Sequence, residues 1–241
     1  MLNPPLFLPA KHRIRQAFDQ AAMTYDTAAE VQREVSDRLA AHLMQMGDNL
    51  NPDTILDAGG GTGYGARQLQ AQWPDTQLTV IDFAPRMLIA ARDQLATARL
   101  ICADIEHLPV ADAGFDLYWS SLAWQWNDPQ RCLAEARRVL KPGGLLTVAT
   151  LGTDNFPELR HAFAEVDDYR HVLTIPDPEY LLAGCRAGGW VIRFWDRQPI
   201  RRYFPDLRTL LHSVKAVGAR EVEQRRPSPL SRSAWQALTA R

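Results

Sequence analysis

The sequence predicts an α/β fold in which a mostly parallel sheet carries a ligand crevice at one edge. Each of three short apolar runs leads into an acidic residue, and these residues are Asp57, Asp82 and Asp104. The first run continues into a glycine cluster at residues 59–63. Because the carboxyl ends of parallel strands share one edge of a sheet, we expect the three acids to converge on one crevice.

The glycine cluster predicts a loop that lies flat against a ligand. Gly59, Gly61 and Gly63 lack a Cβ atom and permit positive φ, so their backbone can approach a bound molecule closely. A phosphate-binding P-loop is excluded, because Tyr64 and not lysine follows Gly63. The strict dinucleotide fingerprint fails as well, because its third glycine is absent. Asp57 would repel a pyrophosphate and suits a ligand with a cationic group.

The next elements alternate helix and strand. A helix at residues 64–72 follows the glycines, and the strand at residues 78–82 ends in Asp82, whose carboxylate can accept two hydrogen bonds from ribose hydroxyls. Pro85 begins a further helix, since proline fits the first helical turn. Strands are expected at residues 100–103 and 115–121.

Two helices are expected ahead of the first strand. Residues 11–22 form the first, and a second begins at Asp26, carries an amphipathic stripe from Val31 to Met46 and stops at Gly47. Tyr25 lies between them. It is either an ordinary surface or core aromatic, or part of a helical lid that reaches the ligand.

An aromatic segment follows the fourth strand. Trp126 is expected to pack in the core, whereas Trp124 and Gln125 lie where the substrate mouth of such a sheet should be. Asp128 caps a helix that ends before the turn at residues 141–144, and a fifth strand follows at residues 145–151.

The pattern changes after the fifth strand. Helices are expected from Phe156, from residues 176–178 and over residues 206–217, with a sixth strand at residues 190–194 and a charged tail from Glu221. We expect one domain over residues 1–241, made of a lid (1–50), a cofactor core (51–151), substrate-side elements (152–217) and a tail (218–241).

Composition narrows the classes of function. The 241 residues are 46% hydrophobic, which is enough for a core, and the formal net charge of -1 offers no global field for nucleic acid. The cysteines Cys102, Cys132 and Cys185 lack metal-ligand spacing, and the histidines are scattered, so no metal site is expected. Because the cysteines have no obvious pairing, we expect a protein of the reducing cytoplasm. No apolar signal segment or run long enough to span a membrane is present, so no membrane partner is expected. We also expect a monomer.

The core motifs resemble those of the class I S-adenosylmethionine-dependent methyltransferases. The matching pieces are residues 56–63, 81–82, 103–105, 115–117 and 140–144. The resemblance implies S-adenosylmethionine as cofactor and a Rossmann-like sheet with helices on both faces. That family's final antiparallel strand is missing here, because no apolar run after Val217 can supply it.

The same resemblance implies which residues bind the cofactor. Gly59 and Gly61 would contact the methionine part, Asp82 the ribose, and Asp104 with Ile105 the adenine. The full set of implied cofactor-binding residues also contains Asp57, Phe83, Met87 and Ser120.

Nearly the whole chain resembles the malonyl-acyl carrier protein O-methyltransferases of biotin synthesis. The pieces that carry this likeness are residues 18–25, 29–33, 119–126, 150–153, 156–159, 213–219 and 228–238. Ser121, Trp124 and the missing last strand depart from that family's pattern.

The narrower resemblance implies a reaction in which a malonyl carboxylate attacks the sulfonium methyl. A carboxylate is already ionised at neutral pH, so no general base is required. Tyr25 would be the catalytic positioning residue, and Arg160 or Arg170 would pair with the malonyl carboxylate. The partner would be an acidic acyl carrier protein, which docks on a basic face formed by Arg193, Arg197, Arg201 and Arg202 or by Arg131, Arg137 and Arg138.

Other functions remain open at this point. A small-molecule carboxyl methyltransferase, such as one acting on trans-aconitate, would share the core motifs. A non-catalytic protein that binds S-adenosylmethionine is a second alternative, and a nicotinamide oxidoreductase is remote because the fingerprint fails.

Overall fold

The computed structural model describes residues 8–46, 50–224, 226–228 and 230–239. Gly47, predicted to end the second helix, lies outside these residues. None of the described helices is both long and apolar enough to cross a membrane.

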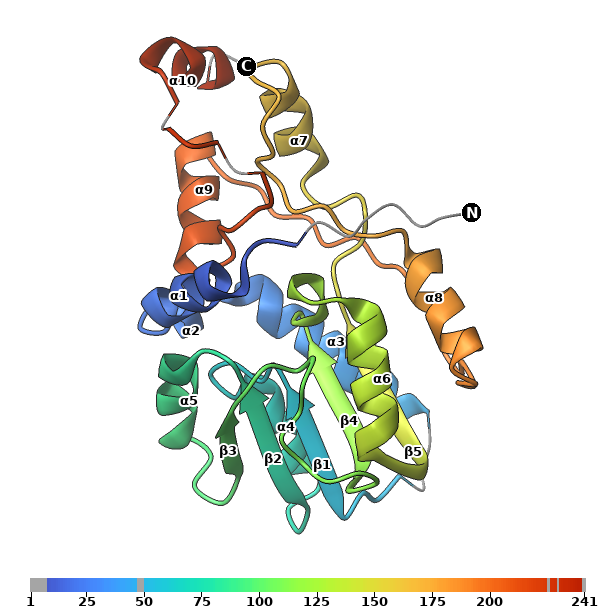
Figure 1. Ribbon diagram of the computed structural model, residues 1–241. Helices are drawn as coiled ribbons and strands as arrows, with labels where there is room; N and C mark the ends of the chain where they lie inside the picture. The colour runs from blue at the N-terminus through green and yellow to red at the C-terminus, as the bar shows by residue number, and fades with distance from the viewer. Residues whose placement is uncertain (1–7, 47–49, 225, 229, 240–241) are drawn as a thin grey trace.

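A five-stranded parallel sheet lies in the lower half of the molecule as drawn in Figure 1. Its order is β3-β2-β1-β4-β5, and every neighbouring pair is parallel. The strands are β1 (Thr54–Ala58), β2 (Gln77–Asp82), β3 (Arg99–Cys102), β4 (Phe115–Ser121) and β5 (Leu140–Ala149). The chain order reverses between β1 and β4, so the crevice of this α/β sheet is expected at their carboxyl ends.

Helices cover both faces of the sheet, because the strands carry apolar side chains on both faces. Ile55 and Leu117 pack against α3 (Glu30–Gln45), α4 (Tyr64–Gln72) and α5 (Pro85–Arg92). Leu56 and Tyr118 point to the opposite face, where Cys132, Leu133 and Ala136 of α6 (Pro129–Val139) complete the core. Parallel strands buried on both faces require this near-continuous apolar sequence.

The amino-terminal helices lie over the carboxyl end of the sheet. α1 (Lys11–Ala21) packs on α5, and the short α2 (Tyr25–Ala28) contacts α9 (Leu207–Ala216). The predicted second helix is wrong in one respect. It is broken at Ala29, whose φ of -82° and ψ of 42° leave the helical region, so α2 and α3 are separate elements. Figure 1 shows α1 and α2 between the sheet and α9.

A second, smaller core lies beyond the lid. It joins α7 (Pro157–Ala164), α9 and α10 (Arg232–Thr239), which gather away from the sheet in Figure 1. Leu159, Phe163 and Val172 are buried there, and Leu210 and Leu211 pack against them. In contrast, α8 (Pro178–Ala187) lies beside α6.

The predicted sixth strand is wrong. Residues 190–200 run without secondary structure, and Val191 and Phe194 are 85% and 49% exposed. A strand is stabilised by ladder bonds to a neighbour, and local apolar composition does not supply that neighbour. Among the described residues, the sheet gains no strand after Ala149.

The fifth strand begins earlier than predicted. β5 starts at Leu140, which pairs with Phe115, and the register shifts before Leu145 pairs with Leu117. Gly143 has a φ of 81° inside this irregular stretch. The turn motif therefore lies within the strand instead of preceding it.

Candidate functional site

The loop after β1 adopts the tight conformation that its glycines permit. Gly59 has a φ of 81°, its N–H donates to the Ile81 carbonyl at 2.7 Å, and a Cβ atom there would lie 2.2 Å from Ala123 Cβ. Gly61 has a φ of 54°, and nothing lies within 4 Å of the position of its absent Cβ atom. Gly59 is therefore required by packing, whereas Gly61 presents open backbone.

Two buried carboxylates lie beside this loop. Asp57 is 2% exposed, and its Oδ2 has no hydrogen-bond partner among the described residues. Asp82 is 7% exposed and accepts from the N–H groups of Gly61 at 2.9 Å and Ala84 at 2.8 Å. A buried charge without a partner is costly, so the site fits a ligand that brings a positive group.

The environment raises the pKa of both acids. Burial, and secondly the neighbouring Asp82 charge, raises the pKa of Asp57 to about 7. Burial raises the pKa of Asp82 to about 6, even though backbone N–H groups favour its ionised form. Two carboxyls that share a buried site resist simultaneous ionisation, so a cationic ligand would restore the charge of Asp57.

The loop after β3 holds the third predicted acid. Ile105 is 5% exposed and packs with the α6 side of the core. The Asp104 side chain is one-third exposed, and its Oδ1 lies 3.0 Å from Lys11 Nζ. The structure thus brings Asp104 to the same end of the sheet as Asp57 and Asp82, under α1.

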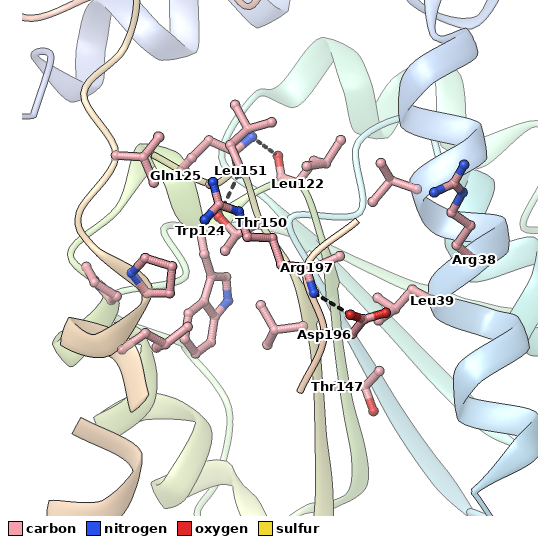
Figure 2. Close-up of a pocket in the computed structure, with 18 of the residues that line it drawn as sticks. Arg38, Leu39, Leu122, Trp124, Gln125, Thr147, Thr150, Leu151, Asp196 and Arg197 are labelled. Carbon is pink, nitrogen blue, oxygen red and sulfur yellow. Dashed lines mark hydrogen bonds between the residues drawn. The ribbon is translucent and has the colours of Figure 1, made fainter. Parts of the chain in front are cut away.

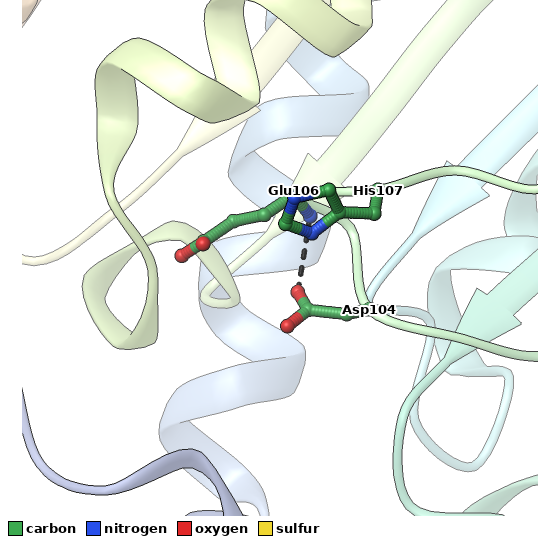
Figure 3. Close-up of side chains that lie close together, drawn as sticks. All are labelled: Asp104, Glu106 and His107. Carbon is green, nitrogen blue, oxygen red and sulfur yellow. Dashed lines mark hydrogen bonds between the residues drawn. The ribbon is translucent and has the colours of Figure 1, made fainter.

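Asp104, Glu106 and His107 form a group whose ligand atoms all lie within 4.8 Å of one another (Figure 3). Such a group could hold a metal ion by distance alone. However, Lys11 Nζ lies 3.0 Å from both Asp104 Oδ1 and Glu106 Oε1, so the chain supplies its own cation. We assign no metal to this group.

Three further residues with an implied cofactor role lie around the crevice. Ser120 is fully buried, and its hydroxyl donates to the Ala58 carbonyl at 2.6 Å, which ties β4 to β1. Met87 is buried in a cluster with Ala84, and Phe83 packs against that cluster. Ser120 therefore supports the end of β1, while Phe83 and Met87 form an apolar wall beside Asp82.

The lid is bound directly to the glycine loop. Thr62 Oγ1 donates to Asp26 Oδ1 at 2.5 Å, and Asp19 Oδ1 accepts from the Arg86 N–H at 3.0 Å. Tyr25 packs on the same apolar cluster as Met87. Burial, followed by the charges of Asp82 and Asp26, raises the pKa of the Tyr25 hydroxyl. This phenol, like that of any tyrosine, is protonated at neutral pH and can donate a hydrogen bond at the crevice.

The segment after β4 differs from its prediction in detail. Trp124 is 2% exposed and packs edge-on against Tyr118 at 6.2 Å, so most of its indole belongs to the core. Gln125 Nε2 donates to the Leu122 carbonyl at 2.6 Å, and its Oε1 accepts from Thr150 Oγ1 at 3.3 Å. Trp126 is buried as predicted and meets Phe18 of the lid edge-on at 5.6 Å.

A groove runs along β5, and its lining does not include Asp57, Gly59 or Asp82 of the crevice at the glycine loop. Its volume is about 2550 Å³, and its lining runs from Thr147 past Gln125 and Trp124 to Tyr25. Figure 2 shows Trp124, Gln125 and Thr150 on one side of this groove and Arg38 of α3 on the other. Tyr25 of the lid thus lies among the residues that line this groove.

The structure does not bring Arg160 or Arg170 to the groove. Arg160 Nη2 donates to Asn155 Oδ1 at 2.6 Å. Arg170 Nη1 donates to Thr174 Oγ1 at 2.7 Å, and its Nε lies 3.5 Å from Glu223. Both guanidinium groups stabilise the carboxyl-terminal part of the fold in this conformation.

The two predicted basic faces are partly neutralised within the chain. In the first, Arg197 pairs with Asp154, and Arg202 pairs with Glu30 and Glu34. Neither Arg193 nor Arg201 has an ion pair within the described residues.

In the second face, Arg138 is bound by Glu135 and Asp112, and Arg131 lies near Glu106 and Asp128. Arg137 lies over the Trp190 ring at 5.5 Å. The first face therefore keeps more uncompensated positive charge.

Sequence reasoning missed the contacts that close the lid. Lys11, Asn127 and the Thr62–Asp26 pair were not predicted, although they join the lid to three different loops. No periodicity or motif identifies them, because each contact links residues at least 36 positions apart.

Comparison with known proteins agrees with this geometry. Residues 56–148 match the methyltransferase domain family model. A malonyl-acyl-carrier-protein O-methyltransferase of Dechloromonas aromatica (strain RCB) is 44% identical over 230 residues, which are 95% of this chain and 85% of that protein. The corresponding protein of Laribacter hongkongensis (strain HLHK9) is 42% identical over 247 residues, covering 97% of this chain and 82% of that protein.

Solved structures support the fold. A possible histamine N-methyltransferase from Thermotoga maritima superposes with a TM-score of 0.54 at 22% identity, covering 72% of this chain and 80% of that one. A geranyl diphosphate C-methyltransferase from Streptomyces coelicolor A3(2), in complex with S-adenosyl-L-homocysteine, gives a TM-score of 0.51 at 15% identity over 63% of this chain and 56% of that one. With its class I methyltransferase fold and these close relatives, the chain belongs to the malonyl-acyl-carrier-protein O-methyltransferase family.

Proposed function

We propose that this enzyme transfers the methyl group of S-adenosylmethionine to the free carboxylate of a malonyl thioester on acyl carrier protein. The observation that supports it most is the buried Asp57, whose Oδ2 has no hydrogen-bond partner among the described residues, beside the open backbone of Gly61, at the point where the strand order reverses. The relatives named above carry the same activity in their names. The product would be a methyl ester and S-adenosylhomocysteine.

The cofactor is assigned to the crevice residues by chemistry. Asp57 would face the α-ammonium group of the methionine part, with Gly59 and Gly61 lying along it. Asp82 would accept from the ribose hydroxyls. Ile105 would cover one adenine face, and Asp104 would accept from the exocyclic amino group. Phe83, Met87 and Ser120 would complete the wall of the site.

The chain's own residues would act mainly by positioning. When bound, the sulfonium supplies an electrophilic methyl group. That methyl group would pass to the acceptor carboxylate, with S-adenosylhomocysteine as the leaving group, and no proton transfer would be required of the chain. Tyr25, protonated at neutral pH, would donate a hydrogen bond that orients the reacting groups. The lid helices would exclude water from the methyl group.

The acceptor is proposed to enter along the groove that β5 lines. Trp124 and Gln125 would set the shape of its inner end. Arg160 and Arg170 remain our candidates to meet the malonyl carboxylate, and either would first have to leave its present hydrogen-bond partner. Arginine suits the role because its planar fork matches a carboxylate.

The cellular role follows from the same proposal. Esterification masks the malonyl charge, which would let the thioester enter the apolar sites of fatty-acid synthesis on the route to biotin. We propose that the protein is a cytoplasmic monomer that needs no metal. We also propose that it is one domain, made of the lid, the cofactor core, the substrate-side elements and the tail.

Mass spectrometry of the acceptor tests the proposal. Malonyl-loaded carrier protein, incubated with enzyme and S-adenosylmethionine, should gain the mass of one CH2 group, because a methyl group replaces the acid hydrogen, and mild base should release that methyl group as methanol, as expected for an ester. A methyl group that resists base, or none at all under conditions where S-adenosylhomocysteine binds, would refute it.

A further inference from the structure

One lysine of the lid holds two loops of the crevice together. Lys11 is the first residue of α1, and its Nζ lies 3.0 Å from Asp104 Oδ1 and 3.0 Å from Glu106 Oε1. The same ammonium group donates to Asn127 Oδ1. Asp104 and Glu106 follow β3, whereas Asn127 follows β4 and is anchored through its own side-chain amide to the Ala123 carbonyl at 2.8 Å.

The electrostatics of this contact favour the closed position of the lid. The Glu106 side chain is only 7% exposed, and besides Lys11 it receives the Asp128 N–H at 2.8 Å and lies 3.6 Å from Arg131. Two neighbouring carboxylates repel each other, and the ammonium group between them offsets that repulsion. The Lys11 side chain is one-third exposed, so water partly screens the pair.

The contact also fixes how Asp104 is presented. Oδ1 of Asp104 accepts from Lys11 Nζ and from the Glu106 N–H, both at 3.0 Å. Within the described residues Oδ2 accepts no hydrogen bond, so it is the oxygen left for a ligand. Figure 3 shows the Asp104 carboxylate held by this backbone bond beside Glu106.

We propose that Lys11 is a positioning residue for the cofactor, a latch that closes the lid over its adenosine end and orients Asp104 toward the 6-amino group of adenine. This inference rests on the proposed function only for the identity of the bound nucleoside. Lys11 itself touches no reacting atom, so it acts on cofactor affinity rather than on the methyl-transfer step.

Calorimetric titration of the full-length protein with S-adenosylhomocysteine tests the latch. Lys11→Met, which keeps the stem and removes the charge, should weaken binding about tenfold, the loss expected for a charge-assisted hydrogen bond. Lys11→Arg should restore most of the affinity. In turnover, Lys11→Met should raise the KM for S-adenosylmethionine by more than it lowers kcat.

A second probe separates positioning from a general loss of structure. S-inosylhomocysteine carries oxygen in place of the 6-amino group, so the wild-type protein should bind it more weakly than S-adenosylhomocysteine. This preference should shrink in Lys11→Met. Unchanged affinity for S-adenosylhomocysteine, or an equal loss for both probes, would overturn the proposal.

The controls use matched charges elsewhere in the chain. Lys141→Met removes another ammonium group that pairs with an acid, Asp116 at 2.8 Å, and should leave both affinities unchanged. If Lys11→Met does not fold, Lys11→Gln takes its place, because it keeps a hydrogen-bond donor but removes the charge. It should also bind S-adenosylhomocysteine more weakly than the wild-type protein does, and should also show a smaller preference for it over S-inosylhomocysteine. These titrations contain no acceptor, so a failure of methyl transfer to malonyl carrier protein would leave their result intact.

Discussion

Asp57 shows how a single residue prepares the crevice for a cation. Its carboxyl group is buried, its Oδ2 is unpartnered within the described chain, and its pKa is raised to about 7 by burial and by Asp82. A raised pKa means that the apo protein binds a proton that the unfolded chain releases. This contribution to stability is therefore present at low pH and is lost as the pH rises from about 4 through 7.

Cofactor affinity should show the opposite trend with pH. Only the ionised form of Asp57 pairs with an ammonium group, so binding of S-adenosylhomocysteine should tighten about tenfold between pH 6 and pH 8. Calorimetry at several pH values measures this slope. Asp57→Asn should flatten it, whereas Asp75→Asn, which changes an exposed acid, should not. An equally steep slope in Asp57→Asn would show that another group titrates.

Tyr25 should contribute to turnover through its hydroxyl group. Like any tyrosine it is protonated at neutral pH, and its raised pKa makes the phenolate rarer still, so it can donate a hydrogen bond but does not act as a base. Tyr25→Phe should lower kcat about tenfold at saturating cofactor, the effect of one lost hydrogen bond. Steady-state kinetics measures this, with Tyr169→Phe as the matched control. An unchanged kcat would mean that the hydroxyl group has no part in the reaction.

At the scale of elements, two glycines of the loop after β1 have different roles. Gly59 is required by packing, whereas Gly61 presents its backbone to the crevice. In Gly59→Ala the new methyl group would overlap Ala123 at a backbone φ of 81°, so a stability loss of about 1–3 kcal/mol is expected. In Gly61→Ala only the φ of 54° opposes the change, at about 1 kcal/mol, and the methyl group would face the crevice. Thermal unfolding and titration with S-adenosylhomocysteine should therefore rank these two variants in opposite orders.

Elements formed by local sequence were predictable, whereas those that need a distant partner were not. The β1–loop–α4 unit follows from adjacent residues, namely an apolar run, glycines and a helix pattern, and the structure contains it as expected. The apolar run at residues 190–194 has a pattern that is equally typical of a strand. However, no neighbouring strand supplies backbone hydrogen bonds to it, so it has no regular secondary structure.

The candidate site divides in the same way. The three strand-end acids were predictable, because parallel topology alone brings strand ends to one edge. The Lys11 contact was not predictable, because it joins residues 93 positions apart through the packing of α1. The position of Arg160 was not predictable either, because α7 packs into a separate small core away from the sheet.

At the scale of the whole molecule, charge should guide the carrier protein to the groove. Arg193 and Arg201 lie on the exposed segment beside β5 and have no ion pair within the described residues. Reversing both charges to glutamate should raise the KM for malonyl carrier protein severalfold, since rim charges mainly speed association.

The KM for a small neutral malonyl thioester should hardly change in that variant. Arg92→Glu, at the end of α5, serves as the matched control and should leave both KM values near the wild type. Equal rises for the two acceptors in the double variant would place carrier docking elsewhere, with Arg131 and Arg137 as the next face to test.

The most direct test of the account is a competition for labelled methyl groups. Malonyl carrier protein, malonyl-coenzyme A and trans-aconitate are offered together at equal concentration with S-adenosylmethionine, and the label on each is counted. We expect most of the label as a base-labile ester on the carrier protein. Label mainly on trans-aconitate, or on none of the three while S-adenosylhomocysteine still binds, would contradict the proposed function.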